Sequence, residues 1–108
     1  MTLQLEQLPM DIAADQLAAF CQKWRVRELA LFGSVLRSDF RPDSDVDVLV
    51  TFADGAPWSL WDWGDMMDEL KSILGRNVDL VEKDAIQNPY RRESILREHR
   101  VIYTRTIQ

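Results

Sequence analysis

The sequence predicts a small α/β (or α+β) fold, in which a mixed β-sheet is flanked by helices. Segments with the apolar pattern of helices alternate along the chain with segments that have the pattern of strands. The chain of 108 residues also has room for one hydrophobic core, so residues 1–108 are expected to form a single domain.

The first expected element is a helix that follows an irregular stretch, residues 1–10, and runs from about Asp11 or Ala14 to Trp24. Asp11 or Asp15 can stabilise the N-terminus of this helix, because acidic side chains are favoured there. One apolar face has helical spacing and consists of Leu17, Phe20, Cys21 and Trp24.

A strand is expected next, at residues 28–32. Its continuous apolar run is typical of a strand that is covered on both faces. Gly33-Ser34 ends this strand, and a short helix can follow through residues 35–37. A polar loop, residues 38–44, then leads to the second strand.

The second half of the chain predicts two helices and two strands. Ser59 can cap a helix that ends near Leu74, and Gly75 suits its C-terminal cap. The apolar stripe of this helix has 3-4-3-4 spacing and consists of Leu60, Trp63, Met67, Leu70 and Leu74. The other expected elements are a strand, a helix and a short edge strand, at residues 77–82, 89–98 and 101–104.

The overall composition excludes several classes of protein. Hydrophobic residues make up 46% and charged residues 29%, as in globular proteins. No apolar run approaches the ~20 residues that span a bilayer, and the N-terminus lacks the pattern of a signal peptide. We therefore expect a cytoplasmic location with no membrane contact. The net charge of −5 argues against extended nucleic-acid binding.

Cysteine and histidine each occur once, as Cys21 and His99. A single cysteine excludes an intrachain disulfide and a zinc-binding cysteine cluster, and its apolar neighbours predict a buried side chain. Catalysis by histidine would have to depend on His99, so the chemistry is expected to rest on carboxylates.

Basic residues gather late in the chain, at Arg91, Arg92, Arg97, Arg100 and Arg105. They can bind a phosphate or an acidic partner. They can also form an ordinary solvated helix face, an interpretation that we favour because Glu93 and Glu98 lie among them.

Two aspartates begin the second strand, at residues 45–52. Strict alternation with valines places Asp45 and Asp47 on one face. Two like charges held this close repel each other, and a divalent cation would offset the repulsion. Because the ligands are oxygens, Mg²⁺ or Mn²⁺ is favoured over zinc.

A third carboxylate, Asp79, lies between apolar residues of the next predicted strand. If the two strands are neighbours, the three acids converge. Such a set can hold two metal ions, the arrangement used for in-line phosphoryl or nucleotidyl displacement. Asp79 would bind the metal that activates the attacking hydroxyl, and it could accept the proton.

Gly33-Ser34 supplies the phosphate-binding half of the expected site. A glycine after a buried strand lets a ligand approach the backbone closely, and the amides of a following helix point at an anion. Ser34 adds a hydroxyl donor. Arg37 can reach the same phosphates, or it can pair with Asp39 or Asp43.

The stretch LFGSVLRSDFRPDSDVDVLV resembles the signature of the polymerase-β-like nucleotidyltransferases. It is most similar to the minimal nucleotidyltransferases that act as antitoxins beside HEPN ribonuclease toxins. Their signature, Gly-Ser, a spacer and Ser-Asp-x-Asp, is met by Gly33, Ser34, Ser44, Asp45 and Asp47, and the family's third acid matches Asp79 in NVDLVE. The resemblance runs from about residue 14 to residue 103.

The resemblance implies a polymerase-β-like fold and a site divided into two groups of residues. Nucleotide binding falls to Gly33, Ser34, Arg37 and Ser44, and metal binding and catalysis to Asp45, Asp47 and Asp79. The chain departs from the Gly-Ser-x-Ala-Arg-Gly of many relatives at two positions, Leu36 and Ser38.

The implied reaction transfers AMP from ATP, with Mg²⁺ or Mn²⁺, to a tyrosine hydroxyl of a HEPN toxin. Two other functions stay open. The chain can neutralise a toxin by contact alone, since Trp58, Trp61 and Trp63 exceed what one helical stripe can bury. It can also modify a small molecule such as an aminoglycoside, although such relatives carry a second domain.

Overall fold

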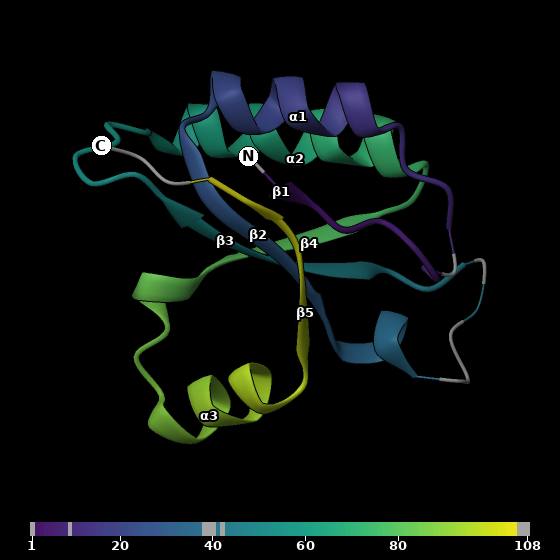
Figure 1. The fold of residues 1–108 in the computed structure, drawn as a ribbon. Helices are drawn as coiled ribbons and strands as arrows, with labels where there is room; N and C mark the ends of the chain where they lie inside the picture. Colours follow the sequence, from purple (N-terminus) through teal and green to yellow (C-terminus); the bar gives the residue numbers. More distant parts are fainter. Residues whose placement is uncertain (1, 9, 38–40, 42, 106–108) are drawn as a thin grey trace.

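A five-stranded mixed sheet with helices on both faces forms the centre of the computed structural model, which describes residues 2–8, 10–37, 41 and 43–105 (Figure 1). The strand order is β1-β5-β2-β3-β4. The strands are β1 Thr2–Leu3, β2 Val26–Phe32, β3 Val46–Phe52, β4 Val78–Glu82 and β5 His99–Thr104. Only the β3–β4 pair is parallel among the described strand pairs, so the mixed sheet is confirmed.

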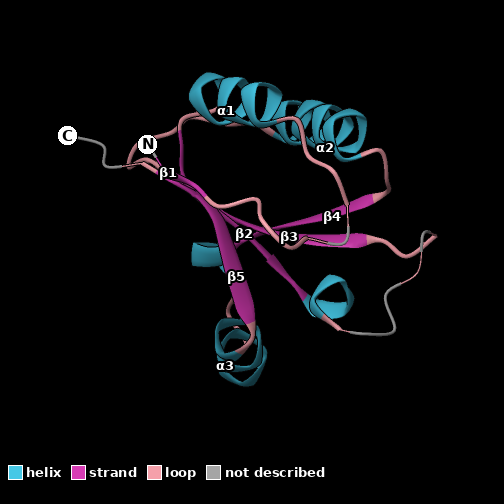
Figure 2. Ribbon diagram, turned by 45° about the vertical axis from the view of Figure 1, so that its right-hand side comes forward, coloured by secondary structure: helices cyan, strands magenta, loops and turns pink. Residues whose placement is uncertain are grey.

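The helices divide unequally between the two faces of the sheet (Figures 1 and 2). α1, Ala14–Lys23, and α2, Leu60–Leu74, lie side by side on one face, and α3, Pro89–Arg97, lies on the other. Two 3₁₀ turns, η1 at Gly33–Leu36 and η2 at Lys83–Ala85, follow β2 and β4. Among the described residues, no helix combines the length and apolar character that crossing a bilayer requires.

The hydrophobic core has two parts, one on each face of the sheet. Leu29 and Leu31 of β2 point into the larger part, beneath α1 and α2. The alternate residues Ala30 and Phe32 point into the smaller part, where Ile95 of α3 packs. This central strand is buried on both faces, as its continuous apolar run predicted.

Both helices of the larger layer have the expected positions. The four apolar residues predicted for α1 are buried: Leu17, Phe20, Cys21 and Trp24. Its N-cap is Ala13 without a side-chain hydrogen bond, and Asp15 lies in the first turn, so Asp11 is not the cap. In α2, Ser59 and Asp62 form a reciprocal capping box, and Gly75 ends the helix with φ +68°.

The predicted stripe of α2 was wrong at its start. Leu60 is 90% exposed, while Met66, absent from the prediction, is fully buried with Leu70 and Leu74. Leu60 lies six residues before Met66, so at about 100° per residue it points roughly 120° away from the inward face. Trp63 and Met67 flank that face and are partly buried.

The sheet differs from expectation at its β1 end. Residues 1–10 were expected to be irregular, but β1 pairs with β5 through Leu3 and Tyr103. β5 is therefore an interior strand, not the predicted edge, and Ile102 and Tyr103 are almost fully buried. A two-residue strand carries no readable alternation, so its pairing could not be predicted locally.

The capping box gives a stability prediction. Ser59→Ala removes the acceptor for the Asp62 amide, a hydrogen bond of 3.2 Å, and should lower the free energy of unfolding by about 1 kcal/mol. Urea denaturation followed by circular dichroism measures the change. Ser72→Ala, at an exposed position inside the same helix, should cost little; an equal loss in both variants would contradict the capping role.

Candidate active site

The Gly33 backbone lies directly against the carboxylate of Asp47. Gly33 follows β2 with φ +74°, a left-handed conformation that favours glycine. A Cβ placed on Gly33 would overlap Asp47 Oδ2 and lie 3.3 Å from Asp47 Cγ. Glycine is therefore required here twice, for its backbone angle and for the space that Asp47 occupies.

The strands that carry the acids are neighbours, which is the condition on which their convergence depended. β3 and β4 run parallel, and Asp47 is in register with Asp79. Val46 and Val48 on either side of Asp47 point into the larger core, so both aspartates project from the face that carries α3. Asp45 is exposed and lies one residue before β3, whose predicted start was therefore one residue early.

The pKa of Asp47 is raised by its surroundings. Partial burial raises this pKa most, and the negative charges of Asp79 and Asp45 raise it further. Two cations oppose the shift, Arg91 first and Arg37 second. Burial and the two nearby acids together therefore disfavour the charged form of Asp47.

The donor set of this acid group fits a hard divalent cation. All three side chains offer oxygens, and a cation among them would relieve the repulsion that raises the pKa of Asp47. In the described part of the chain, no group of three or more His, Cys, Asp or Glu side chains has the spacing of a complete metal site. Asp47 and Asp79 thus face the same side of the sheet without forming a closed cage.

The residues predicted to bind the nucleotide lie in the two loops beside these acids. Ser34 is half-buried in η1, and its carbonyl accepts a hydrogen bond of 3.0 Å from the amide of Arg37. The expected short helix is thus a single 3₁₀ turn, which presents amides but is too short for an appreciable helix dipole. Arg37 is exposed; no ion pair joins it to Asp43 among the described residues, and Asp39 lies outside them.

Ser44 has a structural role in the loop before β3. Its Oγ accepts a hydrogen bond of 3.1 Å from the amide of Arg41, and its own amide donates to the Arg41 carbonyl at 3.0 Å. Ser44 also lines a shallow pocket of about 440 Å³, to which Lys71 and Arg76 contribute positive charge. This pocket opens at the end of the sheet where β3 and β4 begin, near the acids.

Arg91 was not assigned to the site from the sequence. Three of the other late arginines have structural partners: Arg97 pairs with Glu93 at 2.8 Å, Arg92 donates to the Lys83 carbonyl, and Arg100 contacts a backbone carbonyl of the N-terminal segment. Arg91 in the first turn of α3 instead acts on Asp47. The sequence around Arg91 and Arg92 does not indicate which of them faces the acids. That difference depends on how α3 packs against the sheet face that carries the acids.

Parallel strands with paired acids beside a Gly-Ser turn define the class of nucleotidyltransferases. Residues 14–102 match the family model described as "Nucleotidyltransferase domain", and the chain belongs to this family. The nucleotidyltransferase activity and fold class expected from the sequence are thereby confirmed.

Several relatives make the likeness more specific. A protein of Thermococcus cleftensis named protein adenylyltransferase MntA is 38% identical over 82 residues, which cover 76% of this chain and 78% of that protein. A Methanocaldococcus jannaschii protein, provisionally named a protein adenylyltransferase, is 38% identical over 81 residues, covering 75% and 79%.

Solved structures share the fold. One provisionally described as a minimal nucleotidyltransferase has 35% identity and a TM-score of 0.63, with 80% of this chain and 87% of that chain covered. A toxin–antitoxin complex with AMP-PNP has a TM-score of 0.67 at 18% identity, covering 85% and 73%. A third, of a tri-AMPylated Shewanella oneidensis HEPN toxin with an MNT antitoxin, has a TM-score of 0.60 at 17% identity, covering 84% and 69%.

The environment of Asp47 predicts an unusual stability effect. Because its pKa is raised on folding, ionisation of Asp47 opposes folding, and this cost appears as the pH rises through the folded-state pKa. In EDTA at pH 7, Asp47→Asn should therefore raise the melting temperature by a few degrees, on the order of 1 kcal/mol or less. The gain should vanish below the unfolded-state pKa, about 3.9.

Thermal unfolding of the wild type and of Asp47→Asn, followed from pH 7 to below the unfolded-state pKa of about 3.9, measures this difference in melting temperature. Asp65→Asn, at an exposed position on α2, serves as the control and should change little. A lower melting temperature for Asp47→Asn at pH 7 would show that the charge of Asp47 is already compensated within the chain.

Gly33→Ala should disturb Asp47 in addition to straining the backbone. A left-handed alanine costs roughly 1–2 kcal/mol, and Gly55→Ala supplies the matched control because Gly55 has φ +78° with no atom within 4 Å of the position that a Cβ would take. Both variants should lose stability through the backbone, and Gly33→Ala should lose more because the Asp47 carboxylate must shift. Gly33→Ala alone should weaken Mn²⁺ binding, measured by calorimetry, by about tenfold or more. Equal Mn²⁺ affinity in the two variants would show that the contact between the Gly33 backbone and the Asp47 carboxylate does not affect metal binding.

Proposed function

We propose that this protein is a metal-dependent protein adenylyltransferase that transfers AMP from ATP to a tyrosine hydroxyl of a HEPN toxin, thereby acting as its antitoxin. The observation that carries the proposal is the convergence of Asp45, Asp47 and Asp79 on one sheet face beside the Gly33-Ser34 turn. Residues 1–108 are taken as one minimal nucleotidyltransferase domain.

The three carboxylates have separable roles in this proposal. Asp45, Asp47 and Asp79 would hold Mg²⁺ or Mn²⁺, which supplies charge neutralisation of the triphosphate and acidification of the acceptor hydroxyl. Asp47 is fixed between Gly33 and Asp79 and serves as the central ligand. Asp79 is exposed at the edge strand, so it can accept the proton from an incoming hydroxyl.

The bonds that change are those at the α-phosphorus of ATP. The acceptor oxygen attacks this phosphorus, the bond to the bridging oxygen of pyrophosphate breaks, and pyrophosphate leaves with the electron pair. Ser34 and the amides of η1 would donate to phosphate oxygens, with Arg37 adding positive charge. Ser44, which directly precedes Asp45 and whose Oγ accepts from the Arg41 amide, would complete the nucleotide-binding set.

The nature of the acceptor is supported by the relatives. Those with 38% identity include a named protein adenylyltransferase, and solved neighbours with the same fold include toxin–antitoxin complexes, one of them with a tri-AMPylated HEPN toxin. Asp45 and Asp79 are both exposed, so a hydroxyl on the surface of another protein can reach them. The same geometry suits a tyrosine on a partner better than a deeply enclosed small molecule.

A contact-only antitoxin is the second candidate function. Trp61 is 87% exposed beside the exposed Leu60, whereas Trp58 and Trp63 pack partly against the core. One of the three tryptophans thus offers an apolar surface of the kind found in protein interfaces. This surface is compatible with catalysis, because an enzyme that modifies a protein must also bind it.

Labelling of the partner tests the catalytic proposal. The purified protein is incubated with α-³²P-ATP, Mg²⁺ and the HEPN protein encoded beside its gene. We expect label on the HEPN protein, reduced at least about 100-fold by Asp47→Asn or Asp79→Asn and unchanged by Asp65→Asn. Substitution of the modified tyrosine by phenylalanine should abolish the label.

Two outcomes would contradict the proposal. One is the absence of label under conditions in which the two proteins bind each other. The other is full neutralisation of the toxin by both Asp45→Ala and Asp79→Ala variants, which would favour the contact-only function.

A further inference from the structure

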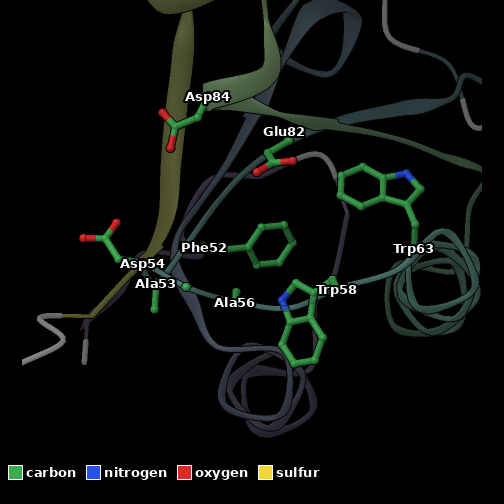
Figure 3. A pocket seen from close by; sticks show the side chains of 9 residues that line it. Phe52, Ala53, Asp54, Ala56, Trp58, Trp63, Glu82 and Asp84 are labelled. Atoms are coloured by element: carbon green, nitrogen blue, oxygen red, sulfur yellow. The ribbon is translucent and has the colours of Figure 1, made fainter.

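An aromatic pocket with an acidic rim lies at the far ends of β3 and β4 (Figure 3). Its volume is about 350 Å³, within the range of small-ligand sites. Its walls are Phe52, Trp58 and Trp63, and its acidic residues are Asp54, Glu82 and Asp84. We call it the aromatic–acidic pocket.

The aromatic–acidic pocket is separate from the catalytic acids. Phe52 lies five residues beyond Asp47 on β3, roughly 16 Å along the strand. Strand alternation also places Phe52 on the opposite face from Asp47, with the larger core. The pocket therefore belongs to neither the metal site nor the Gly-Ser turn.

The aromatic walls hold one another in place. Phe52 makes edge-to-face contacts with Trp58 and Trp63, with ring centroids 6.4 and 6.2 Å apart. Trp58 is also packed against Trp24, at 5.1 Å. Figure 3 shows the rings of Phe52, Trp58 and Trp63 grouped around the pocket, with Glu82 on the opposite side of Phe52 from Trp58. The pocket is thus lined by aromatic side chains whose positions are set by core packing.

The acids of the rim leave negative charge available. Asp54 pairs with Arg27 at 3.5 Å. Within the described ranges, no hydrogen bond or ion pair engages the side chain of Glu82 or Asp84. Aromatic faces beside carboxylates favour an organic cation, since both attract positive charge.

Two exposed apolar side chains beside the pocket indicate that a protein carries the cation. Leu60 and Trp61, which follow Trp58 closely in the chain, are 90% and 87% exposed. Exposed apolar and aromatic surface of this kind is typical of protein interfaces.

We propose that the aromatic–acidic pocket binds an arginine side chain presented by a partner protein. The planar guanidinium stacks on the aromatic rings and pairs with Glu82 and Asp84, for which arginine is better suited than lysine. The exposed Leu60 and Trp61, next to Trp58 in the chain, extend the surface on which the partner lies.

This inference does not depend on adenylyl transfer, because no nucleotide or metal is needed for the binding. The test uses ¹⁵N-labelled full-length protein titrated with the peptide Ac-Gly-Arg-Gly-NH₂. We expect saturable movement of the Trp58 indole resonance, assigned with Trp58→Phe. The peptide with citrulline in place of arginine has the same shape without charge and should bind at least tenfold more weakly.

Variants locate the binding site. Glu82→Gln should weaken the arginine peptide about fivefold or more, whereas the exposed Asp65→Asn and the catalytic-site Asp47→Asn should leave it unchanged. Equal affinities of the arginine and citrulline peptides, or of the wild type and Glu82→Gln, would overturn the proposal. Circular dichroism of each variant establishes that it is folded.

Discussion

The close approach of the Gly33 backbone to the Asp47 carboxylate is the constraint on which the site depends. It joins the end of β2 to the start of β3 and places the central acid beside the Gly33-Ser34 turn. Parallel pairing of β3 with β4 then brings Asp79 beside Asp47. Two strand pairings and one glycine thus bring together the groups that we propose to bind phosphate and metal.

This arrangement costs the apo fold some stability. Burial and two neighbouring acids raise the pKa of Asp47, so the isolated site is electrostatically unfavourable, as functional sites often are. Arg91 and Arg37 offset part of the repulsion. A divalent cation with its nucleotide would offset more, which ties the free energy of ligand binding to the charge that the fold has concentrated on one face.

Much of the fold and of the candidate site could be predicted from the sequence, because the residues that indicate them are close together in the chain. The buried run of β2, the alternation in β3 and the caps of α2 each follow from side-chain spacing, and the acid in β4 was conspicuous among apolar residues. Non-local packing was not predictable. The pairing of β1 with β5, the exposure of Leu60 and the approach of Arg91 to Asp47 depend on how distant segments meet. The aromatic–acidic pocket likewise joins residues of β3, β4 and the segment before α2.

The most direct test of the central claim is a crystal structure with Mn²⁺ and a non-hydrolysable ATP analogue, in which anomalous scattering locates the metal. We predict an anomalous peak within coordination distance of Asp47 and Asp79 oxygens, with the triphosphate against Ser34 and the amides that follow Gly33. Metal and nucleotide bound elsewhere on the protein, with Asp47 and Asp79 free of both, would contradict the assignment of the active site.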